Sequence, residues 1–523
     1  MILSVLAVVV TTIRWPLAGD SALMHYVCFL SRHGFVPYRT IQDQNFPGSY
    51  LPDWILQYLF GASSLAWRLY DFGLLAAISV SMFLIARRSG RFAALWASCL
   101  LILIHARDGM REAGERDLFA AALLVAGVAA FLWAKHSKRL APAFLFGVAA
   151  GSALTVKPTF LLFCLLPVFD QLFSQDERAL FMRRCAVVAA GIACPLLGCV
   201  LWLASIHSLS NFAYTLEVLA PYHASLGRAA WGFLFYNSIS SMRFLFVLWL
   251  AILLLGRLGS TPFQVRSLPD AVLRRTLMYC AFAGWLSYLL QRKAYLYQRD
   301  PFLVFLLLLI ALDLNAFLSL LGNRSQKWLS AAALLWTAAI FAPVSAWKAA
   351  HYQSPDAAFQ AQLSTDLRLV DTRDHLGPLS GKVQCLDTID GCIDTLERLQ
   401  LTQASGQIYD EYLFQPSTRE VIRDSRSSYA QELQTNPPLI FIVTASLFPS
   451  GPDGYEKLAQ WQGFDDWLNQ YYVLAVERTP ETGYRSMGRP VVPAGYRLYV
   501  RRDAGGVPNS RVVDATTISA QSH

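Results

Sequence analysis

Charged residues are scarce in this sequence, and their scarcity excludes most soluble folds. Only 15% of the 523 residues are charged, whereas 55% are hydrophobic. An ordinary soluble domain carries about 25% charged residues. Several stretches reach about 18 residues almost without charge, which is the length that a helix needs to cross the hydrocarbon core of a bilayer. The composition therefore predicts an α-helical polytopic membrane protein.

Motifs for nucleotide and metal chemistry are also missing. The sequence contains no Walker, dinucleotide-binding or zinc-spacing motif and no internal repeat. We therefore expect no resident cofactor, although a divalent metal ion is left open. The N-terminus lacks the positively charged segment and the small-residue cleavage site of a signal peptide. The stretch before Asp20 therefore indicates a first membrane span.

Cysteine is present but follows no metal-binding pattern. Seven of the nine cysteines sit in apolar segments, where a thiol packs as a small, soft side chain. Cys385 and Cys392 instead flank a short polar loop. They could form a disulfide if that part of the chain lies outside the cytoplasm, but their spacing alone leaves the pairing open.

The positive charges indicate a topology rather than a nucleic-acid partner. The net charge is +8, but the basic residues cluster in every second loop between hydrophobic stretches. These loops hold Arg87, Arg88 and Arg91; Lys135, Lys138 and Arg139; Arg178, Arg183 and Arg184; Arg257, Arg266, Arg274 and Arg275; and Arg324 and Lys327. Cytoplasmic loops carry such an excess, so the predicted partner is the lipid bilayer and not nucleic acid.

The hydrophobic stretches and basic loops together predict about eleven transmembrane helices. After the first span they cover residues 63–86, 92–105, 118–134, 140–156, 159–173, 185–206, 231–256, 276–290, 301–321 and 328–346. An odd number places the N-terminus in the cytoplasm and the C-terminal part outside the inner (plasma) membrane.

Three regions follow from this topology. Residues 1–347 form the membrane part, with a first outer loop at 18–62, and residues 348–502 form a small extracytoplasmic α/β domain. Short β-rich runs predict strands at 382–386, 439–443 and 496–500, and apolar spacing predicts a mostly helical segment at 455–472. Residues 503–523 are predicted to be a disordered tail.

The first outer loop ends in an amphipathic segment. Tyr50, Leu51, Trp54, Ile55, Tyr58 and Leu59 fall on one stripe of a helix, while Asp53 and Gln57 lie off it. Such a helix is expected to lie flat on the membrane interface.

Two carboxylates of this loop are candidates for catalysis. Asp20 follows the first span, where it could act as a general base or cap a helix. Asp43 and Asn45 are two residues apart and face the same way in an extended segment. The alternative for Asp43 is a polar turn.

Further charged and aromatic residues fall in the other predicted outer loops. Fixed cations at a membrane surface suit a phosphate leaving group, which needs charge stabilisation more than protonation. The candidates for substrate and phosphate binding are Arg111, Glu115, Arg116, Lys157, Lys293 and Tyr297. Structural explanations stay open for Glu115 as an acidic residue at a helix start, for Lys157 as a snorkelling lysine, and for Lys293 and Tyr297 as part of an aromatic belt.

Three short motifs carry a family resemblance. GFVPYRTIQDQNFPG, residues 34–48, is similar to a G-x-x-P-Y-x-D-x-x-D-x-N-P-P run, and GERDLF, residues 114–119, to a G-Q-R-E-H motif. LQRKAYLYQRDP, residues 290–301, is similar to L-Q-x-K-G-x-x-Y-H-x-x-P, with Ala294 in place of the glycine and Gln298 in place of the histidine. With these motifs the chain resembles the GT-C fold glycosyltransferases that use polyprenyl-phosphate sugars. Within them it is most similar to the bacterial branch related to protein mannosyltransferases and to aminoarabinose and lipopolysaccharide-core sugar transferases.

The resemblance implies a membrane glycosyltransferase. It would transfer a sugar from a polyprenyl-phosphate donor to an envelope acceptor at the outer face of the cytoplasmic membrane. The family's catalytic carboxylate maps onto Asp20 and its second polar site onto Asp43. A flippase for lipid-linked sugars is the first alternative, although transporters favour ionisable residues at the bilayer midplane and repeated halves. A non-catalytic envelope assembly protein is the second.

Overall fold

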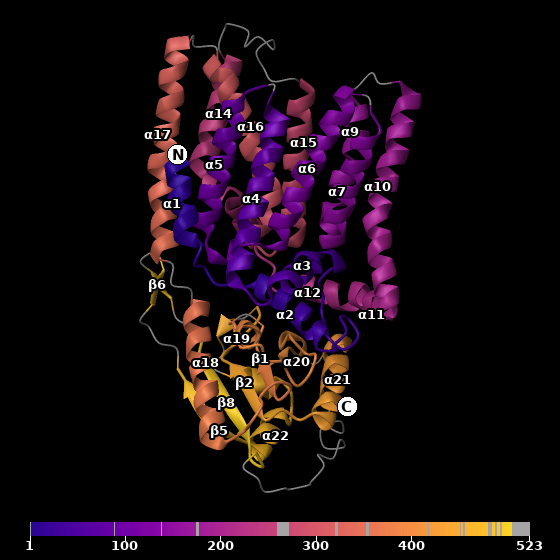
Figure 1. The fold of residues 1–523 in the computed structure, drawn as a ribbon, viewed down its shortest axis with the longest axis vertical. Helices are drawn as coiled ribbons and strands as arrows, with labels where there is room; N and C mark the ends of the chain where they lie inside the picture. Colours follow the sequence, from indigo (N-terminus) through magenta and orange to yellow (C-terminus); the bar gives the residue numbers. More distant parts are fainter. Residues whose placement is uncertain are drawn as a thin grey trace.

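The computed structural model shows a helical bundle with a smaller mixed domain at one end (Figure 1). The residues that it describes are 2–87, 89–137, 139–173, 177–258, 271–319, 323–351, 355–388, 390–416, 418–449, 451–452, 455–479, 484–486, 489–491 and 494–504. The predicted disordered tail from residue 505 onward, and the basic residues Arg88, Lys138 and Arg266, lie outside these ranges.

Helices occupy every predicted span. They are α1 (Ile2–Thr12), α4 (Ser64–Ala86), α5 (Arg91–Asp108), α6 (Arg116–Ser137), α7 (Ala141–Val156), α8 (Leu161–Cys164), α9 (Leu166–Gln171), α10 (Arg178–Ser205), α13 (Trp231–Ile239), α14 (Arg243–Leu258), α15 (Ala271–Gln291), α16 (Asp300–Ser319) and α17 (Asn323–His351). Within the described ranges, six helical segments are long and apolar enough to cross a membrane. The predicted polytopic helical class is confirmed, while the count of eleven spans stays a prediction.

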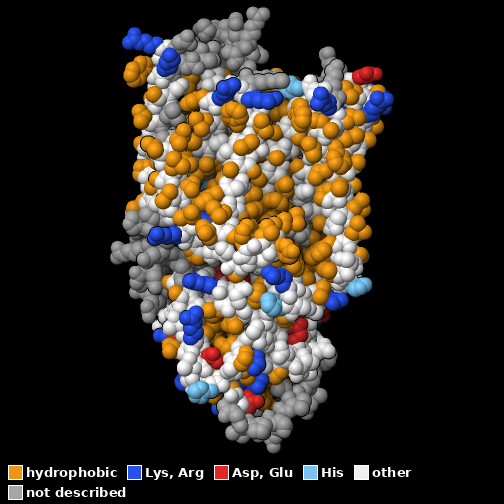
Figure 2. Space-filling view, viewed as in Figure 1, with side chains coloured by type: hydrophobic (Ala, Val, Ile, Leu, Met, Phe, Trp, Pro, Cys, Tyr) orange, Lys and Arg blue, Asp and Glu red, His pale blue; other side chains and the backbone are white. Residues whose placement is uncertain are grey.

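The surface of the bundle matches a membrane protein. On the face seen in Figure 2, hydrophobic side chains cover the bundle, and Lys and Arg gather at the end opposite the C-terminal domain. Arg91 and Arg178 are the first residues of α5 and α10, and Arg139 lies between α6 and α7. The helices α5, α6 and α16 form the buried centre of the bundle.

A layer of short helices lies between the bundle and the C-terminal domain. It contains α2 (Asp20–Arg32), the 3-10 helix η1 (Pro47–Tyr50), α3 (Leu51–Phe60), α11 (Leu209–Tyr214) and α12 (Ala220–Ser225). Gly48 of η1 packs directly on α7, since a Cβ atom there would come within 2.1 Å of the Thr155 Oγ1. Close packing of backbone on backbone therefore fixes this layer to the bundle.

The predicted amphipathic helix exists as α3, with its polar side turned inward. Asp53 and Gln57 are 2% and 3% exposed, whereas Tyr58 is 83% exposed. Asp53 Oδ1 lies 3.2 Å from the His25 Nδ1, and Gln57 donates a hydrogen bond to the His25 carbonyl. An outward apolar stripe next to a membrane bundle suits a helix lying at the lipid interface.

The C-terminal part is a four-stranded mixed sheet covered by helices. The strand order is β1 (Val383–Leu386), β2 (Ile440–Thr444), β8 (Tyr496–Arg501) and β5 (Tyr472–Arg478), with β1 parallel to β2 and the other pairs antiparallel. The helices are α18 (Pro355–Asp374), α19 (Cys392–Arg398), α20 (Glu411–Phe414), α21 (Glu420–Thr435) and α22 (Phe464–Tyr471). Two short strand pairs lie at Ser446–Leu447 with Gly451–Pro452 and at Tyr484–Ser486 with Arg489–Val491. The predicted strands match β1, β2 and β8, while the predicted helix at 455–472 shortens to α22 and a 3-10 turn.

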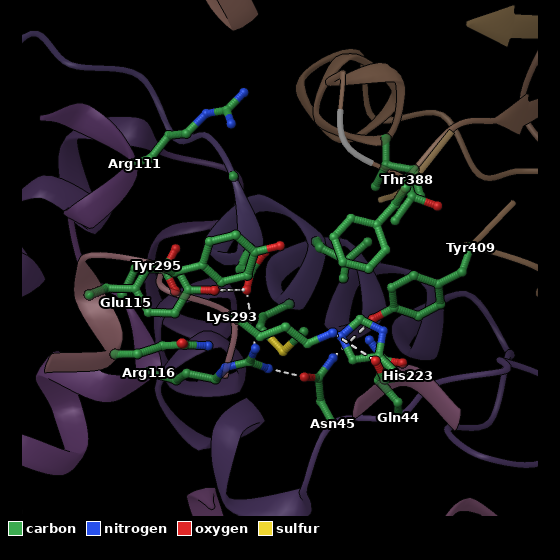
Figure 3. A pocket seen from close by; sticks show the side chains of 18 of the residues that line it. Gln44, Asn45, Arg111, Glu115, Arg116, His223, Lys293, Tyr295, Thr388 and Tyr409 are labelled. Carbon is green, nitrogen blue, oxygen red and sulfur yellow. Dashed lines mark hydrogen bonds and ion pairs between the residues drawn. The ribbon is translucent and has the colours of Figure 1, made fainter. Parts of the chain in front are cut away.

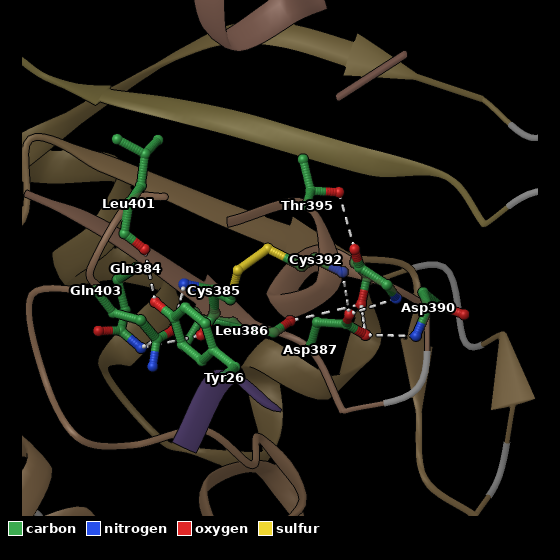
Figure 4. The surroundings of a disulfide bond; sticks show 12 residues. Tyr26, Gln384, Cys385, Leu386, Asp387, Asp390, Cys392, Thr395, Leu401 and Gln403 are labelled. Carbon is green, nitrogen blue, oxygen red and sulfur yellow. Dashed lines mark hydrogen bonds between the residues drawn. A yellow bond between two sulfur atoms is a disulfide. The ribbon is translucent and has the colours of Figure 1, made fainter. Parts of the chain in front are cut away.

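A disulfide joins Cys385 at the end of β1 to Cys392 at the start of α19 (Figure 4). The loop between them is also held by Asp387, whose side chain accepts hydrogen bonds from the backbone amides of Asp390, Gly391 and Cys392. The Tyr26 hydroxyl of α2 donates to the Leu401 carbonyl, three residues after the end of α19, at 3.0 Å. The Tyr26 contact attaches the C-terminal domain to the layer of short helices, here called the interfacial layer.

Candidate active site

A cavity of about 350 Å³ lies where the helical bundle meets the C-terminal domain. Its walls come from the start of α2, the Gln44–Asn45 turn, the loops that precede α6 and α16, the short helix α12 and the loops after β1 and before α20 (Figure 3). Segments distant in sequence thus converge on one site at the bundle end.

Asp20 is the first residue of α2 and points into this cavity. The preceding Gly19 has φ +72° and carries no Cβ, so it makes the turn into the helix without strain. Asp20 Oδ2 accepts hydrogen bonds from the Tyr297 hydroxyl at 2.6 Å and from the Arg116 Nη2 at 3.1 Å. Burial alone would raise the Asp20 pKa, but Arg116 and Tyr297 lower it below its ordinary value. Asp20 is therefore held as a carboxylate anion.

Arg116 connects Asp20 to a buried polar network. Its Nη1 donates to the Asn45 Oδ1 (Figure 3), and the Asn45 Nδ2 donates to the Asp43 Oδ1 at 2.8 Å. Asn45 Nδ2 also contacts the Tyr409 hydroxyl at 3.0 Å, and that hydroxyl donates to Asp43 at 3.0 Å. The Arg116 guanidinium has five N–H donors, so donors remain for a ligand after these two contacts.

Asp43 lies behind this wall and not on it. Its side chain is 0% exposed. It accepts hydrogen bonds from the backbone amides of Gln44 and Asn45, from the Asn45 side chain and from the hydroxyls of Tyr50 and Tyr409. The position is a saturated polar turn, and its geometry suits a positioning role better than chemistry.

Lys157 also lies outside the cavity wall. Its Nζ donates to the Asp117 Oδ2 at 2.5 Å and to the Gln291 Oε1 at 2.8 Å. The ammonium sits 5.6 Å from the centre of the Tyr297 ring. Lys157 therefore supports Tyr297 from behind, and phosphate binding by it stays a prediction.

The other predicted residues line the cavity together. Arg111, Glu115, Arg116, Lys293 and Tyr297 share it with Asp20. Glu115 accepts hydrogen bonds from the backbone amide and the hydroxyl of Ser21 at 3.3 and 3.1 Å. Burial and the nearby Asp20 charge raise the Glu115 pKa well above its ordinary value, against the opposing effect of Arg116.

Lys293 binds the backbone at the end of α12. Its Nζ donates to the backbone carbonyls of His223 and Leu226 and lies 5.1 Å from the centre of the Phe448 ring. Burial lowers the Lys293 pKa to about 8, against the opposing effect of Glu411. The lysine is therefore a cation that titrates close to neutral pH.

Several wall residues were not among the sequence candidates. They are Tyr295, His223 and, from the C-terminal domain, Thr388, Asp394, Tyr409 and Glu411. His223 belonged to a predicted outer loop, and Tyr295 alternates with Lys293 and Tyr297 in a motif that the sequence offered. Nothing in the sequence pattern marks Tyr409 or Glu411, because only the fold brings them to the membrane part.

A metal site does not form among the described residues. In these parts of the chain, no three His, Cys, Asp or Glu side chains are grouped as metal ligands. The possible divalent metal stays an untested prediction.

The sequence and the fold are similar to those of known membrane proteins. A family model described as dolichyl-phosphate-mannose-protein mannosyltransferase matches residues 44–175. ArnT from Cupriavidus metallidurans bound to undecaprenyl phosphate superposes with a TM-score of 0.59 at 14% identity, covering 97% of this chain and 98% of that one. The chain has the GT-C fold. Among curated proteins, no sequence matches significantly.

A second group of GT-C structures agrees. The archaeal oligosaccharyltransferase AglB from Archaeoglobus fulgidus, in complex with an inhibitory peptide and a dolichol-phosphate, has a TM-score of 0.53 at 12% identity. The match covers 96% of this chain and 76% of that one. The family match, residues 44–175, includes Asn45, Glu115 and Arg116 of the GT-C cavity.

Proposed function

We propose that this GT-C protein transfers a sugar from a polyprenyl-phosphate donor to an envelope acceptor. The observation that carries the proposal is the position of Asp20: a carboxylate held by Arg116 and Tyr297 in a cavity at the end of the membrane bundle. Relatives in fold are described with undecaprenyl phosphate or dolichol-phosphate bound, which supports a lipid-linked donor. The acceptor is a glycolipid, polysaccharide or protein of the envelope.

The geometry suits a single displacement. Asp20 Oδ2 is engaged, whereas Oδ1 has no partner among the described residues and takes the proton of the acceptor hydroxyl. The acceptor oxygen then bonds to the anomeric carbon, and the bond to the phosphate oxygen breaks. The lipid phosphate leaves with the electron pair, stabilised by Arg116 and Lys293. One base and one displacement invert the anomeric centre.

The charge distribution supports the orientation in the membrane. Basic residues gather at the bundle end opposite the cavity (Figure 2), as the positive-inside rule expects for the cytoplasmic side. The cavity and the C-terminal domain then face the outside of the inner membrane. The Cys385–Cys392 disulfide agrees with this orientation, because disulfides persist in the oxidising compartments outside the cytoplasm.

The test is sugar transfer by membranes that contain the parent protein or Asp20→Asn at matched protein levels. Labelled polyprenyl-phosphate sugars are the donors, and total envelope material is the acceptor. We expect transfer by the parent and a loss of at least about 100-fold in the variant, as general-base removal typically gives. Equal transfer by both proteins would remove Asp20 from the mechanism, and lipid-sugar movement across vesicles without transfer would favour a flippase.

A further inference from the structure

A histidine–carboxylate pair joins the membrane part to the C-terminal domain at the cavity wall. His223 comes from α12 of the interfacial layer and Glu411 from the start of α20 in the C-terminal domain. The His223 Nδ1 lies 2.7 Å from the Glu411 Oε1. Glu411 is fully buried, and in the described part of the chain its second oxygen, Oε2, has no hydrogen-bond partner. Both residues line the cavity.

Contacts to the ring and to the backbone fix His223 in place. The Phe448 ring stacks on it with 5.5 Å between centroids and an angle of 13° between planes. The His223 carbonyl accepts a hydrogen bond from Lys293 at 2.7 Å. The His223 side chain keeps 27% exposure. Since Nδ1 is occupied and one face is covered, Nε2 is the polar atom left to meet a ligand.

The pair sets the hydrogen-bonding character of that atom. A carboxylate accepts hydrogen bonds, so in the neutral imidazole it fixes the proton on Nδ1 and leaves Nε2 as an acceptor. An acceptor beside a buried carboxylate repels phosphate and suits a neutral donor such as a hydroxyl group. The cations Arg111, Arg116 and Lys293 contribute the part of the wall that suits phosphate, and Lys293 borders the pair because its Nζ donates to the His223 carbonyl.

We propose that the His223–Glu411 pair is a binding site for a sugar hydroxyl. His223 Nε2 accepts the hydroxyl's hydrogen bond, and Glu411 is a positioning residue that acts through His223. The inference rests on the proposed function and deepens it, because it separates a phosphate side of the cavity from a sugar side. The hydroxyl belongs either to the donor sugar or to a sugar of the acceptor.

The same protein contains a matched control for the simpler possibility that the pair only tethers the two domains. His25 on α2 and Glu397 on α19 also join the interfacial layer to the C-terminal domain, with 3.7 Å between the Nε2 and Oε1 atoms. Glu397 does not line the large cavity. Loosening the domain contact there leaves the proposed hydroxyl site intact.

The experiment measures binding by the purified full-length protein in detergent to two probes. These are undecaprenyl phosphate and undecaprenyl phosphate carrying a hexose or pentose that the parent transfers or binds. His223→Phe is expected to weaken binding of the sugar-bearing lipid about fivefold, the effect of one hydrogen bond, and to leave binding of the bare lipid phosphate unchanged. Glu411→Gln should weaken binding of the sugar-bearing lipid about twofold. His223→Gln should bind this lipid more tightly than His223→Phe does, because the glutamine can still accept a hydrogen bond. Glu397→Gln should leave the ratio of the affinities for the sugar-bearing and the bare lipid unchanged.

The outcomes separate the two sources of the hydroxyl and the two proposals. A selective loss for the sugar-bearing lipid assigns the site to the donor. Unchanged affinity for both lipids, with an increase of the acceptor concentration at half-maximal transfer, assigns it to the acceptor. Three results would overturn the hydroxyl site while leaving the proposed function in place. They are equally weakened binding of both lipids, a change of the affinity ratio in Glu397→Gln as large as that in His223→Phe, and no change in any variant. A parent protein that neither prefers the sugar-bearing lipid nor transfers sugar contradicts both.

Discussion

The two walls of the cavity differ in charge. The wall from the membrane part carries the cations Arg111, Arg116 and Lys293 beside the acidic residues Asp20, Glu112 and Glu115, whereas the charged residues of the wall from the C-terminal domain are all acidic, namely Asp387, Asp394 and Glu411. Among the described lining residues, none from the C-terminal domain is a lysine or arginine. A cavity with this polarity orients a ligand that is anionic at one end and hydroxyl-rich at the other. A lipid-linked sugar phosphate has that pattern.

The walls also differ in what fixes them. The membrane wall depends on a hydrogen-bond network that runs from the buried Asp43 through Asn45 and Arg116 to Asp20. The opposite wall depends on the Cys385–Cys392 disulfide and the backbone hydrogen bonds to the intervening loop. Tyr409 is where they meet, because it belongs to the C-terminal domain and donates to Asp43. The predictions below test each wall separately.

The largest effect is expected for Arg116→Met. It removes the guanidinium that contacts both Asp20 and Asn45, and two charge-assisted hydrogen bonds to a phosphate are worth about 100-fold in affinity. Binding of undecaprenyl phosphate to the purified protein measures this loss. Arg116→Lys should recover only part of it, because an ammonium lacks the planar fork.

Arg228→Met provides the control for nonspecific charge. Arg228 is exposed, and its side chain donates to the Ala224 carbonyl near the cavity but does not line it. Its removal should change lipid phosphate binding less than about twofold, the range of an exposed charge. An equal loss in Arg228→Met and Arg116→Met would show that the membrane wall acts only through its overall charge.

An intermediate effect is expected for Asp43→Asn. The new side-chain amide would place an NH2 group, which donates hydrogen bonds, against hydroxyl and amide groups that also donate. Such a mismatch at a buried site costs about 2 to 4 kcal/mol of stability. Thermal unfolding in detergent should show the lower stability. Binding should weaken about tenfold and equally for the sugar-bearing and the bare lipid, because Asn45 and Arg116 lose their support. Normal thermal stability with a selective loss of transfer would instead give Asp43 a direct part in the reaction.

Asp20 and Asp43 show what the sequence could and could not predict. Hydropathy and loop charge predict the bundle, and a carboxylate directly after the first hydrophobic segment is predicted to lie at the membrane surface. Asp43 and Asn45 share one polar turn, and the sequence gives no reason to place Asn45 on the cavity wall and Asp43 behind it. That choice depends on Tyr409, 364 residues after Asn45.

The same limit applies to other contacts between distant segments. The stripe on α3 was recognised from its period, yet only the structure shows that Asp53 on its polar side is buried against His25. His223 and Glu411 are 188 residues apart. Local patterns encode helices, strands and exposure to lipid, whereas these pairings depend on tertiary packing that no local pattern contains.

The smallest expected effect concerns the pH dependence of the membrane wall. Burial lowers the Lys293 pKa to about 8, so the lysine is charged below that pH and loses its charge as the pH rises through it. The phosphate of the bare lipid, with a second pKa of about 6, is already doubly ionised in this range. Undecaprenyl phosphate should therefore bind about threefold more weakly at pH 9 than at pH 7, a modest loss because Arg116 stays charged. Lys293→Arg should bind with the same affinity at both pH values, because arginine keeps its charge. An equal alkaline loss in both proteins would assign the titration to a group other than Lys293, and the cationic part of the membrane wall would then rest on arginine alone.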